Sequence, residues 1–402
     1  MNSGFRLGHI AGVEIGVDWS LLIIFFLITF SLGMGVFPSW HPEWSAAVAW
    51  STAVAAALLF FASVLAHELS HALVGRAMGV PINRITLFVF GGMAQMDGEP
   101  PTWRAELAMA IVGPLTSLVL GFGFLWLAST IAGPIELNPD APGETLAGLG
   151  VLATLLMWLG PINVVLGLFN LVPGFPLDGG RILRAVLWAV TGDHLRATRF
   201  ASRIGQVFAW LLIAAGLVMM LGLRLPFFGG GWFSGLWLAF IGWFLNNAAL
   251  MSYRQLVVRE ALENVPVARI MQKRFQSVSP DMPIATLVAD HVMASGQRSF
   301  PVEQDDRFVG LVCLQDLQRH PRESWDKGTV GQIMTRAEAM TSLSPEQDAA
   351  EAMTVLARRD VNQLPVLDGA RLVGLLRRED VLKWLSIHQA GRTHGGRAQP
   401  AI

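Results

Sequence analysis

The pentapeptide His67-Glu68-Leu69-Ser70-His71 contains the residues of this chain that are best suited to chemistry. Residues four apart lie on one face of a helix, so His67 and His71 can bind the same metal ion. Glu68, beside the first histidine, could hold a water molecule on that metal and take its proton. The spacing therefore predicts a hydrolytic metal site with Glu68 as the general base.

The setting of this motif favours a function over a chance match. The motif follows an uncharged run from Ala46 to Ala66, and its apolar flanks favour a helix over a loop. Together, the run and the motif are long enough to span a bilayer, which takes about 20 helical residues. Ionisable side chains at membrane depth are costly unless they are used. We therefore interpret the motif as a site inside a membrane span.

A catalytic zinc ion usually has three protein ligands and one open position, so two histidines leave this site one ligand short. The chain has a single cysteine, Cys313, which excludes a cysteine-rich site and leaves histidine or a carboxylate as the ligand. Asp178 is the best candidate, because it is the only carboxylate in its apolar neighbourhood. An unpaired aspartate there would be costly, whereas one bound to a divalent cation would not. The alternative is that Asp178 caps a helix that begins near Gly180.

Composition identifies most of the chain as a membrane protein. Of 402 residues, 53% are hydrophobic and 15% are charged, whereas a soluble domain has about a quarter of its residues charged. The net charge of −1 argues against the basic surface of a nucleic-acid-binding protein, so we expect no nucleic-acid partner. Apolar runs dominate up to about Tyr253, and the sequence is polar from Arg254 onward. We therefore predict a membrane domain over residues 1–253 and a soluble part after it.

Six apolar stretches are long enough to cross a bilayer. The fourth is interrupted by Gly160-Pro161 and ends in a segment rich in proline and glycine, which cannot continue a helix. Between the second and third stretches, residues 81–98 alternate between apolar and polar types, which predicts a strand or hairpin with a glycine bend. The predicted spans are Trp19–Phe37, Ala46–Met78, Leu107–Ala132, Leu146–Leu177, Ile204–Leu223 and Trp232–Met251.

Positive charge predicts the orientation of these spans. Arginines follow the second, fourth and sixth spans, whereas the loops after the first and third spans contain no lysine or arginine. Positively charged loops stay on the cytoplasmic side, so both termini and the motif end of the second span should be cytoplasmic. The prediction is a multi-pass protein of the cell membrane.

The soluble part is an internal repeat, because residues 264–320 align with residues 328–385. Phe300-Pro301-Val302, for example, matches Leu364-Pro365-Val366. The sequence pattern of each half predicts a short strand, an amphipathic helix, two strands and a second helix. Residues 386–402 are rich in glycine, arginine and histidine, and we expect a disordered tail there.

The membrane domain resembles the site-2 protease family of intramembrane zinc metalloproteases over about residues 8–250. The resemblance implies that His67, His71 and Asp178 hold one Zn²⁺ ion. It also implies that Glu68 takes a proton from the water that attacks a peptide carbonyl, and that Asn170 helps to hold the substrate or the developing oxyanion. For Asn170 an alternative stays open, namely a polar residue that ends a helix and bonds to freed backbone. The matching residues are His67, Glu68, His71, Asn170, Pro173, Pro176, Leu177, Asp178, Gly179 and Gly180.

The family resemblance also implies a substrate class. Its members cut transmembrane segments of other proteins, such as membrane-tethered regulators or signal-peptide remnants, in regulated intramembrane proteolysis, and this compact form resembles bacterial and archaeal members. Peptide bonds inside a helix are shielded, so such a segment must unwind before it is cut. An unwound segment could add a strand to the predicted strand-like residues 85–96.

The repeat resembles a tandem pair of CBS domains, which often bind adenine nucleotides in a cleft between two units. Asp316 and Asp380 match the position whose carboxylate contacts ribose. The serine or threonine usual three residues earlier is replaced by Cys313 in one half and by Arg377 in the other. Two roles therefore stay open: a nucleotide-sensing regulatory module, or a docking module that forms a homodimer.

A rival function is a CBS-gated ion channel or transporter with a divalent-metal site. Discontinuous membrane helices are common in transporters. A transport site, however, does not require Glu68 between two histidines. We therefore predict a mainly α-helical zinc endopeptidase with six transmembrane helices, a short membrane-associated β-hairpin and an α/β tandem CBS module.

Overall fold

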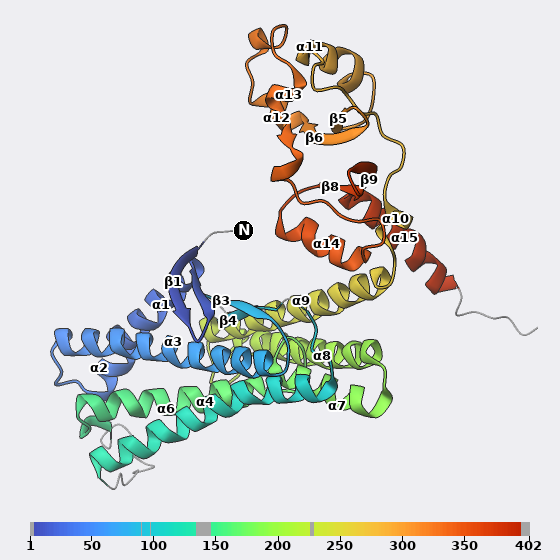
Figure 1. Cartoon of the computed structure of the whole chain (residues 1–402). Coiled ribbons are helices and arrows are strands. Elements are labelled where there is room, and N and C mark those ends of the chain that lie inside the picture. Colours follow the sequence, from blue (N-terminus) through green and yellow to red (C-terminus); the bar gives the residue numbers. More distant parts are fainter. Residues whose placement is uncertain (1–3, 90, 97, 134–145, 226–228, 395–402) are drawn as a thin grey trace, which may run out of the picture. The chain divides into compact units, whose positions relative to one another are not determined.

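The computed structural model describes residues 4–89, 91–96, 98–133, 146–225 and 229–394 (Figure 1). The chain forms two compact units, which we call the membrane unit, Met1–Arg254, and the repeat unit, Gln255–Ile402.

Six helical stretches of the described chain are long and apolar enough to cross a membrane. The first combines α1 (Ser20–Ser31), the π-helical turn η1 (Leu32–Val36) and α2 (Phe37–Trp40). The other five are α3 (Ala46–Ala77), α4 (Trp103–Ala132), α6 (Val151–Asn170), α8 (His194–Met220) and α9 (Trp232–Leu262). The predicted mainly helical architecture with six spans is therefore confirmed.

Two helix ends differ most from the prediction, and α4 and α6 differ from it by fewer residues. α8 begins at His194 rather than Ile204, and α9 continues to Leu262 rather than ending at Met251. The prediction followed the apolar stretch, which marks where a helix can cross lipid. Helical hydrogen bonding does not stop at that boundary, so both helices extend into polar sequence.

The predicted interruption at Gly160-Pro161 was wrong, because α6 is helical through both residues. Proline is tolerated inside membrane helices, since neighbouring groups can satisfy the backbone groups that it frees. Gly160 faces α4 so closely that an added Cβ would lie 2.6 Å from Leu125 Cγ. The small residue therefore allows α4 and α6 to pack tightly. The helix ends at Asn170, where the segment rich in proline and glycine begins, as predicted.

Four strands form one sheet in the order β1-β2-β3-β4. β3 (Ile82–Phe88) and β4 (Gly91–Met96) are the hairpin predicted within residues 81–98. β1 (Gly4–Ile10) and β2 (Val13–Asp18) form a second hairpin that the sequence analysis missed, and β2 pairs in parallel with β3. Figure 1 shows the sheet beside α3.

One face of the sheet packs on the motif helix. Val13, Ile15 and Ile85 are buried in a cluster that includes Ala72 of α3 and Met109 of α4. The face is apolar because alternate residues of β2 and β3 are valine, isoleucine and leucine. This packing places β4 next to the part of α3 that carries the motif.

The turn after α6 leads into α7 (Asp178–Thr191), a short amphipathic helix. Gly179 and Gly180 lie directly against the backbone of Leu171 and Gly174, and a side chain at either glycine would overlap it. Because these two residues lack side chains, the chain can fold back tightly after α6. This tight turn lets α7 begin beside α3 and α4.

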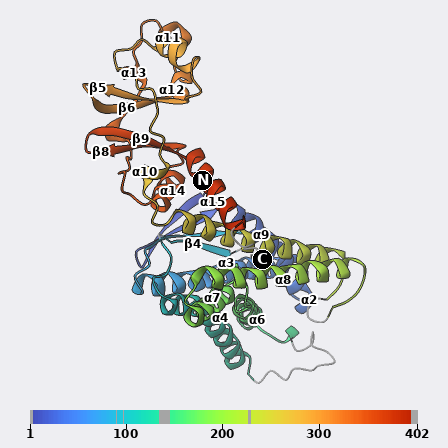
Figure 2. The same cartoon turned by 90° about the vertical axis from the view of Figure 1, so that its right-hand side faces the viewer.

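The repeat unit contains two similar halves, each with a β-hairpin and its own apolar core. Figure 2 shows the two hairpins, β5–β6 and β8–β9. The strands are β5 (Ser299–Gln304), β6 (Arg307–Cys313), β7 (Thr335–Arg336), β8 (Gln363–Asp368) and β9 (Arg371–Arg377). The helices are α10 (Val267–Ile270), α11 (Ile284–Thr286), η2 (Leu287–Val292), α12 (Leu314–Gln318), η3 (Arg322–Ser324), α13 (Val330–Ile333), η4 (Ala337–Ala339), α14 (Ala349–Arg358) and α15 (Arg378–His394).

The last helix reaches further than the predicted end of the second half. α15 continues to His394, so the first part of residues 386–402, expected as a disordered tail, is helical here. Residues 395–402 lie outside the described part of the chain.

Candidate metal centre and catalytic site

The three predicted ligand residues converge at one point in the membrane unit. The Nε2 atoms of His67 and His71 each lie 3.1 Å from Oδ2 of Asp178, and 3.2 Å from each other. The histidines come from α3 and Asp178 is the first residue of α7, 111 residues after His67. The Asp178 carboxylate therefore points at the imidazoles, and the proposed alternative as a helix cap does not describe it.

Each imidazole is held by its other nitrogen. Nδ1 of His67 lies 2.9 Å from Oγ of Ser117, and Nδ1 of His71 donates to the carbonyl oxygen of Met109 at 2.6 Å. All three side chains involved, His67, His71 and Ser117, are buried. These contacts fix the ring orientations, so both Nε2 atoms face Asp178.

The backbone of α4 passes directly beside the Nε2 atoms of the two rings at Gly113. A Cβ atom added there would overlap the imidazole of His71 and lie 2.8 Å from Nε2 of His67. Glycine is therefore required at this point by the close approach of the helix.

The donor set fits a zinc ion. Zinc is commonly bound by imidazole nitrogens and a carboxylate oxygen, with bonds of about 2.0 Å, and a tetrahedron with such bonds has edges of about 3.3 Å. The three ligand atoms of His67, His71 and Asp178 are 3.1 to 3.2 Å apart, close to that spacing. Among the described residues, these are the ones grouped closely enough to hold a metal ion.

Glu68 lies beside this cluster rather than in it. Its side chain packs against the backbone of Gly92 of β4. An added Cβ at Gly92 would overlap the Glu68 side chain. The start of β4 thus covers the carboxylate proposed as the general base.

Asn170 is the last residue of α6, and its side-chain nitrogen donates to the carbonyl oxygen of Leu166 at 3.0 Å. This contact is the one expected of a polar residue that ends a helix. A catalytic role for Asn170 therefore stays a prediction.

A buried ion pair, which the sequence analysis did not identify, attaches α7 to α4. Nε of Arg184 lies 2.5 Å from Oε1 of Glu106, whose side chain is fully buried, and Nη2 lies 3.3 Å from Oε2 of Glu99. The guanidinium also lies over the ring of Phe175, 5.2 Å from its centre. Arg184 lies six residues after Asp178 on the same helix, so the pair anchors the element that carries that carboxylate.

Replacing Ser117 with alanine is expected to weaken zinc binding about 10- to 100-fold, because loss of a partner that orients a ligand histidine typically has this effect. The measurement is competition for zinc between the purified full chain and a chromophoric chelator. Thr116→Ala is the matched control, because the Thr116 hydroxyl donates to Val112 of its own helix. Equal zinc affinity in the two variants would contradict the role given to Ser117.

The two nucleotide candidates in the repeat unit are engaged locally. Asp316 accepts a hydrogen bond from the backbone nitrogen of Cys313 at 2.8 Å and caps α12. Asp380 binds the Arg377 guanidinium with both carboxylate oxygens, at 2.8 and 2.7 Å, which raises the pKa of Arg377. Burial, together with the Asp316 carboxylate, raises the pKa of the Cys313 thiol to about 11. A ribose contact by Asp380 would require Arg377 to release it.

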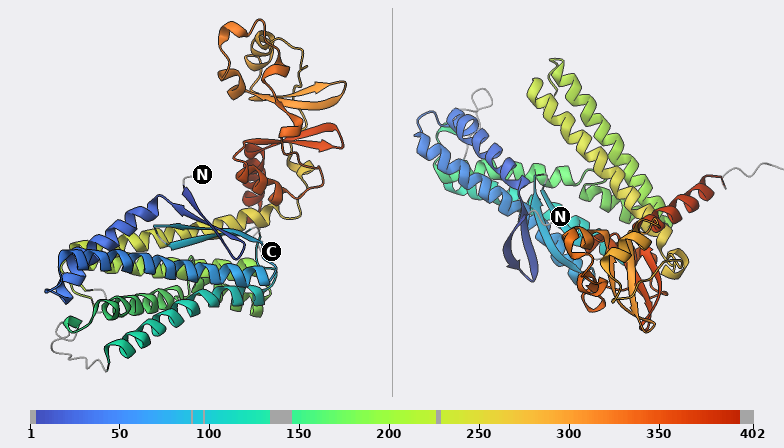
Figure 3. Two further views of the ribbon diagram at one scale, coloured as in Figure 1. Left: turned by 60° about the vertical axis from the view of Figure 1, so that its left-hand side comes forward. Right: turned by 90° about the horizontal axis from the view of Figure 1, so that it is seen from above.

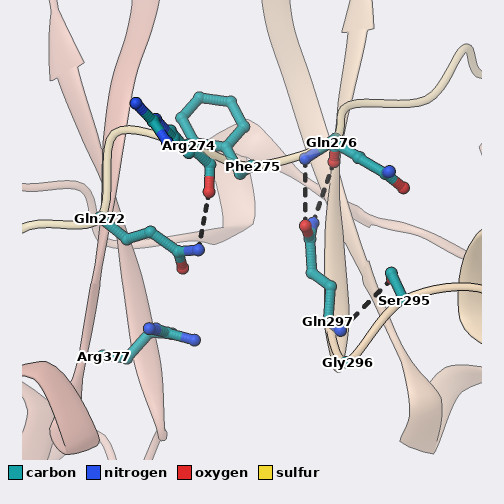
Figure 4. Close-up of a pocket in the computed structure, with 8 residues that line it drawn as sticks. All are labelled: Gln272, Arg274, Phe275, Gln276, Ser295, Gly296, Gln297 and Arg377. Atoms are coloured by element: carbon teal, nitrogen blue, oxygen red, sulfur yellow. Dashed lines mark hydrogen bonds between the residues drawn. The ribbon is translucent and has the colours of Figure 1, made fainter.

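A cleft of about 580 Å³ lies in the repeat unit near these residues (Figure 4). Arg274, Phe275 and Arg377 line it, together with glutamines 272, 276 and 297. Its charged lining groups are two arginines, which suit an anionic ligand, but such a ligand would compete with Asp380 and Glu379 for Arg377.

Comparison with known proteins gives matches to both parts of the chain. A model described as "Peptidase family M50" matches residues 55–212, and one described as "CBS domain" matches residues 267–323 and 330–387. The chain is 33% identical over 394 residues to a Synechocystis sp. protein named "Putative zinc metalloprotease sll0528", covering 97% of each chain. It is 29% identical over 387 residues to "Zinc metalloprotease MJ0392" of Methanocaldococcus jannaschii, covering 96% of this chain and 97% of that protein. Among solved structures, it is similar to a site-2 protease from Methanocaldococcus jannaschii, with 29% identity, a TM-score of 0.41, and coverage of 62% of this chain and 94% of that one.

Proposed function

Because the chain belongs to peptidase family M50, the site-2 proteases, and is a multi-pass membrane metalloprotease, we propose that it cuts peptide bonds within membrane-spanning segments of other proteins. The observation that carries the proposal is the convergence of His67, His71 and Asp178 in the membrane unit, with Glu68 beside them. A hydrolytic site built from membrane helices is suited to a substrate that is itself in the membrane.

His67, His71 and Asp178 would hold the zinc ion, oriented by the contacts with Ser117 and the Met109 carbonyl. When bound, zinc supplies Lewis acidity, which polarises a peptide carbonyl and makes water a nucleophile near neutral pH. Glu68 accepts the proton of the attacking water on its carboxylate and passes it to the leaving amine.

We place the substrate along the outer edge of β4. β4 is the last strand in the sheet order, so this edge is unpaired within the described sheet, whereas β3 is paired on both sides. The contact between Gly92 and Glu68 brings the edge beside the proposed base. An unwound segment that adds a strand there would present its backbone to the site. The sequence hypothesis covered residues 85–96, and the sheet order narrows it to Gly91–Met96.

Proline scanning of β4 tests this placement. Neighbouring residues of a strand direct their N–H groups to opposite edges of that strand. Of the two variants Met93→Pro and Ala94→Pro, one therefore removes an N–H donor from the free edge of β4, and the other removes a hydrogen bond to β3. The free-edge variant is expected to reduce cleavage about fivefold, the effect of one backbone hydrogen bond of roughly 1 kcal/mol, with zinc content unchanged. Full turnover by both variants would rule out strand addition at β4.

We further propose that the CBS domains regulate the protease from the cytoplasm. The arginines that follow the second, fourth and sixth spans support a cytoplasmic location for both termini. The cleft with Arg274 and Arg377 supports an adenine nucleotide as ligand, bound through its phosphates. A homodimer formed through the same domains is the alternative role.

The test of the proposed protease uses the full chain in liposomes with a substrate that carries one transmembrane segment. Removal of zinc by a chelator should stop cleavage, added Zn²⁺ should restore it, and mass spectrometry should map the cut within the apolar segment. A channel or transporter would instead show ion flux and no cut. Zinc-independent cleavage, or cuts confined to the soluble flanks, would refute the proposal.

A further inference from the structure

β1 is an edge strand whose side chains are all exposed, although several of them are apolar. Phe5, Leu7 and Ile10 are 52%, 68% and 44% exposed, respectively. β1 pairs with β2 alone within the described sheet, and Figures 1 and 3 show it projecting beyond the helices of the membrane unit. We propose that β1 lies in the boundary region of the lipid bilayer, with its apolar side chains among the lipid chains.

The register of the hairpin shows that the apolar face of β1 continues a core face. Directly opposed residues of antiparallel strands point to the same side of a sheet. Phe5 opposes Val17 and Ile10 opposes Val13, and β2 buries this face against the helices. The helices therefore cover this face of the sheet at β2, whereas the same face is exposed at β1.

The opposite face of β1 is polar. Arg6 opposes Gly16 and His9 opposes Glu14. Nε of Arg6 also lies 3.1 Å from Oε1 of Glu14, and the Arg6 side chain is largely exposed. β1 thus has one apolar and one charged face, as a strand at a boundary between lipid and water requires.

Two contacts place both ends of β1 at the same membrane surface. The ring of Phe5 lies 4.3 Å from that of Trp19, which directly precedes α1. At the other end, Nη1 of Arg76 donates to the carbonyl oxygen of Ala11 in the hairpin turn, one residue before α3 ends. The start of one span and the end of the next lie at the same surface, so β1 runs along that surface.

Lipid is the occupant that these neighbours favour. Ile23, Phe26 and Phe30 of α1 are exposed, which is expected of the lipid-facing side of a span. Phe5 and Trp19 continue this apolar surface onto the hairpin, and tryptophan is typical of the lipid–water interface. The exposed guanidinium of Arg6 can reach lipid phosphates from the polar face. The apolar face of β1 is therefore continuous with the lipid-facing surface of α1.

The test measures the surroundings of two neighbouring residues that lie on opposite faces. Cys313→Ser removes the one native cysteine, and Ile10→Cys or His9→Cys then takes a nitroxide spin label in the full chain. The protein is placed in vesicles of phosphatidylcholine and phosphatidylglycerol. Oxygen is concentrated in lipid and a nickel chelate in water, so relaxation by each reports the depth of the label.

The ratio of oxygen to nickel accessibility is expected to be several-fold higher for the label at position 10 than for the label at position 9. Equal ratios with high nickel accessibility would place β1 in water and overturn the proposal. Low accessibility to both reagents at position 10, with broadening between labels of different molecules, would indicate a second copy and also overturn it. The readout does not use cleavage, so it is independent of the proposed proteolysis.

Discussion

Glu68→Gln is expected to abolish peptide hydrolysis while zinc binding is retained. Glutamine has the same shape and can keep the contact with Gly92, but it cannot accept a proton from water. Loss of a general base typically lowers turnover about 10²- to 10⁴-fold. Turnover is measured in liposomes, and zinc content by elemental analysis of the same sample.

Asp178→Asn is the matched comparison, because it also removes one carboxylate. Asp178 lies within 3.1 Å of both imidazoles, so this variant should lose zinc and hydrolysis together. The informative result is that Glu68→Gln loses hydrolysis but keeps zinc, whereas Asp178→Asn loses both. If Glu68→Gln cleaves normally, or loses its zinc as Asp178→Asn does, Glu68 is not the base.

Glu106→Ala is expected to destabilise the membrane unit by roughly 3–5 kcal/mol, because it removes the fully buried partner of the Arg184 guanidinium and leaves it only the more exposed Glu99. The loss should also reach the site, since Arg184 anchors the helix that begins with Asp178. Displacement of a site group by about 1 Å can lower turnover about 10²-fold. The measurements are thermal unfolding in detergent and zinc affinity.

Two controls distinguish the effect of losing a buried ion pair from the effect of losing a charge at any position. Arg196→Ala breaks an exposed pair with Asp193 and should change stability by no more than about 1 kcal/mol. Replacing Glu106 and Arg184 together with apolar residues should be less damaging than Glu106→Ala alone, because the buried Arg184 charge is removed together with its buried partner. A Glu106→Ala protein that unfolds at the wild-type temperature and keeps full zinc affinity would show that the pair does not position Asp178.

The sequence was sufficient to predict the elements whose signal is local. Apolar length predicted the six spans, and the density of proline and glycine predicted the end of α6 at Asn170. Asp178 could be selected as a ligand because a lone carboxylate in an apolar segment requires a partner. The interruption predicted at Gly160-Pro161 was wrong, because the tolerance of a membrane helix for proline depends on its neighbours, which one sequence does not reveal.

The features that were missed depend on how distant segments align. Ser117 and the Met109 carbonyl reach the imidazoles only through the register of α4 against α3. Glu106 and Arg184 are ordinary charges until α7 folds back against α4. β2 owes its place in the sheet to parallel pairing with β3, a strand far along the chain. Length, hydropathy and motif spacing carry no information on these alignments.

The bare backbone at Gly113 has a consequence for anyone who needs an inactive reference form of this protein. Substitution of a catalytic acid or a ligand changes the charge of the membrane interior, and with it the way in which a substrate is held. A single methyl group at Gly113 would instead overlap the imidazole of His71 and lie 2.8 Å from Nε2 of His67, and it would remove no ionisable group from the chain. Gly113→Ala would therefore obstruct the zinc-binding nitrogens while all three ligand residues and Glu68 are retained.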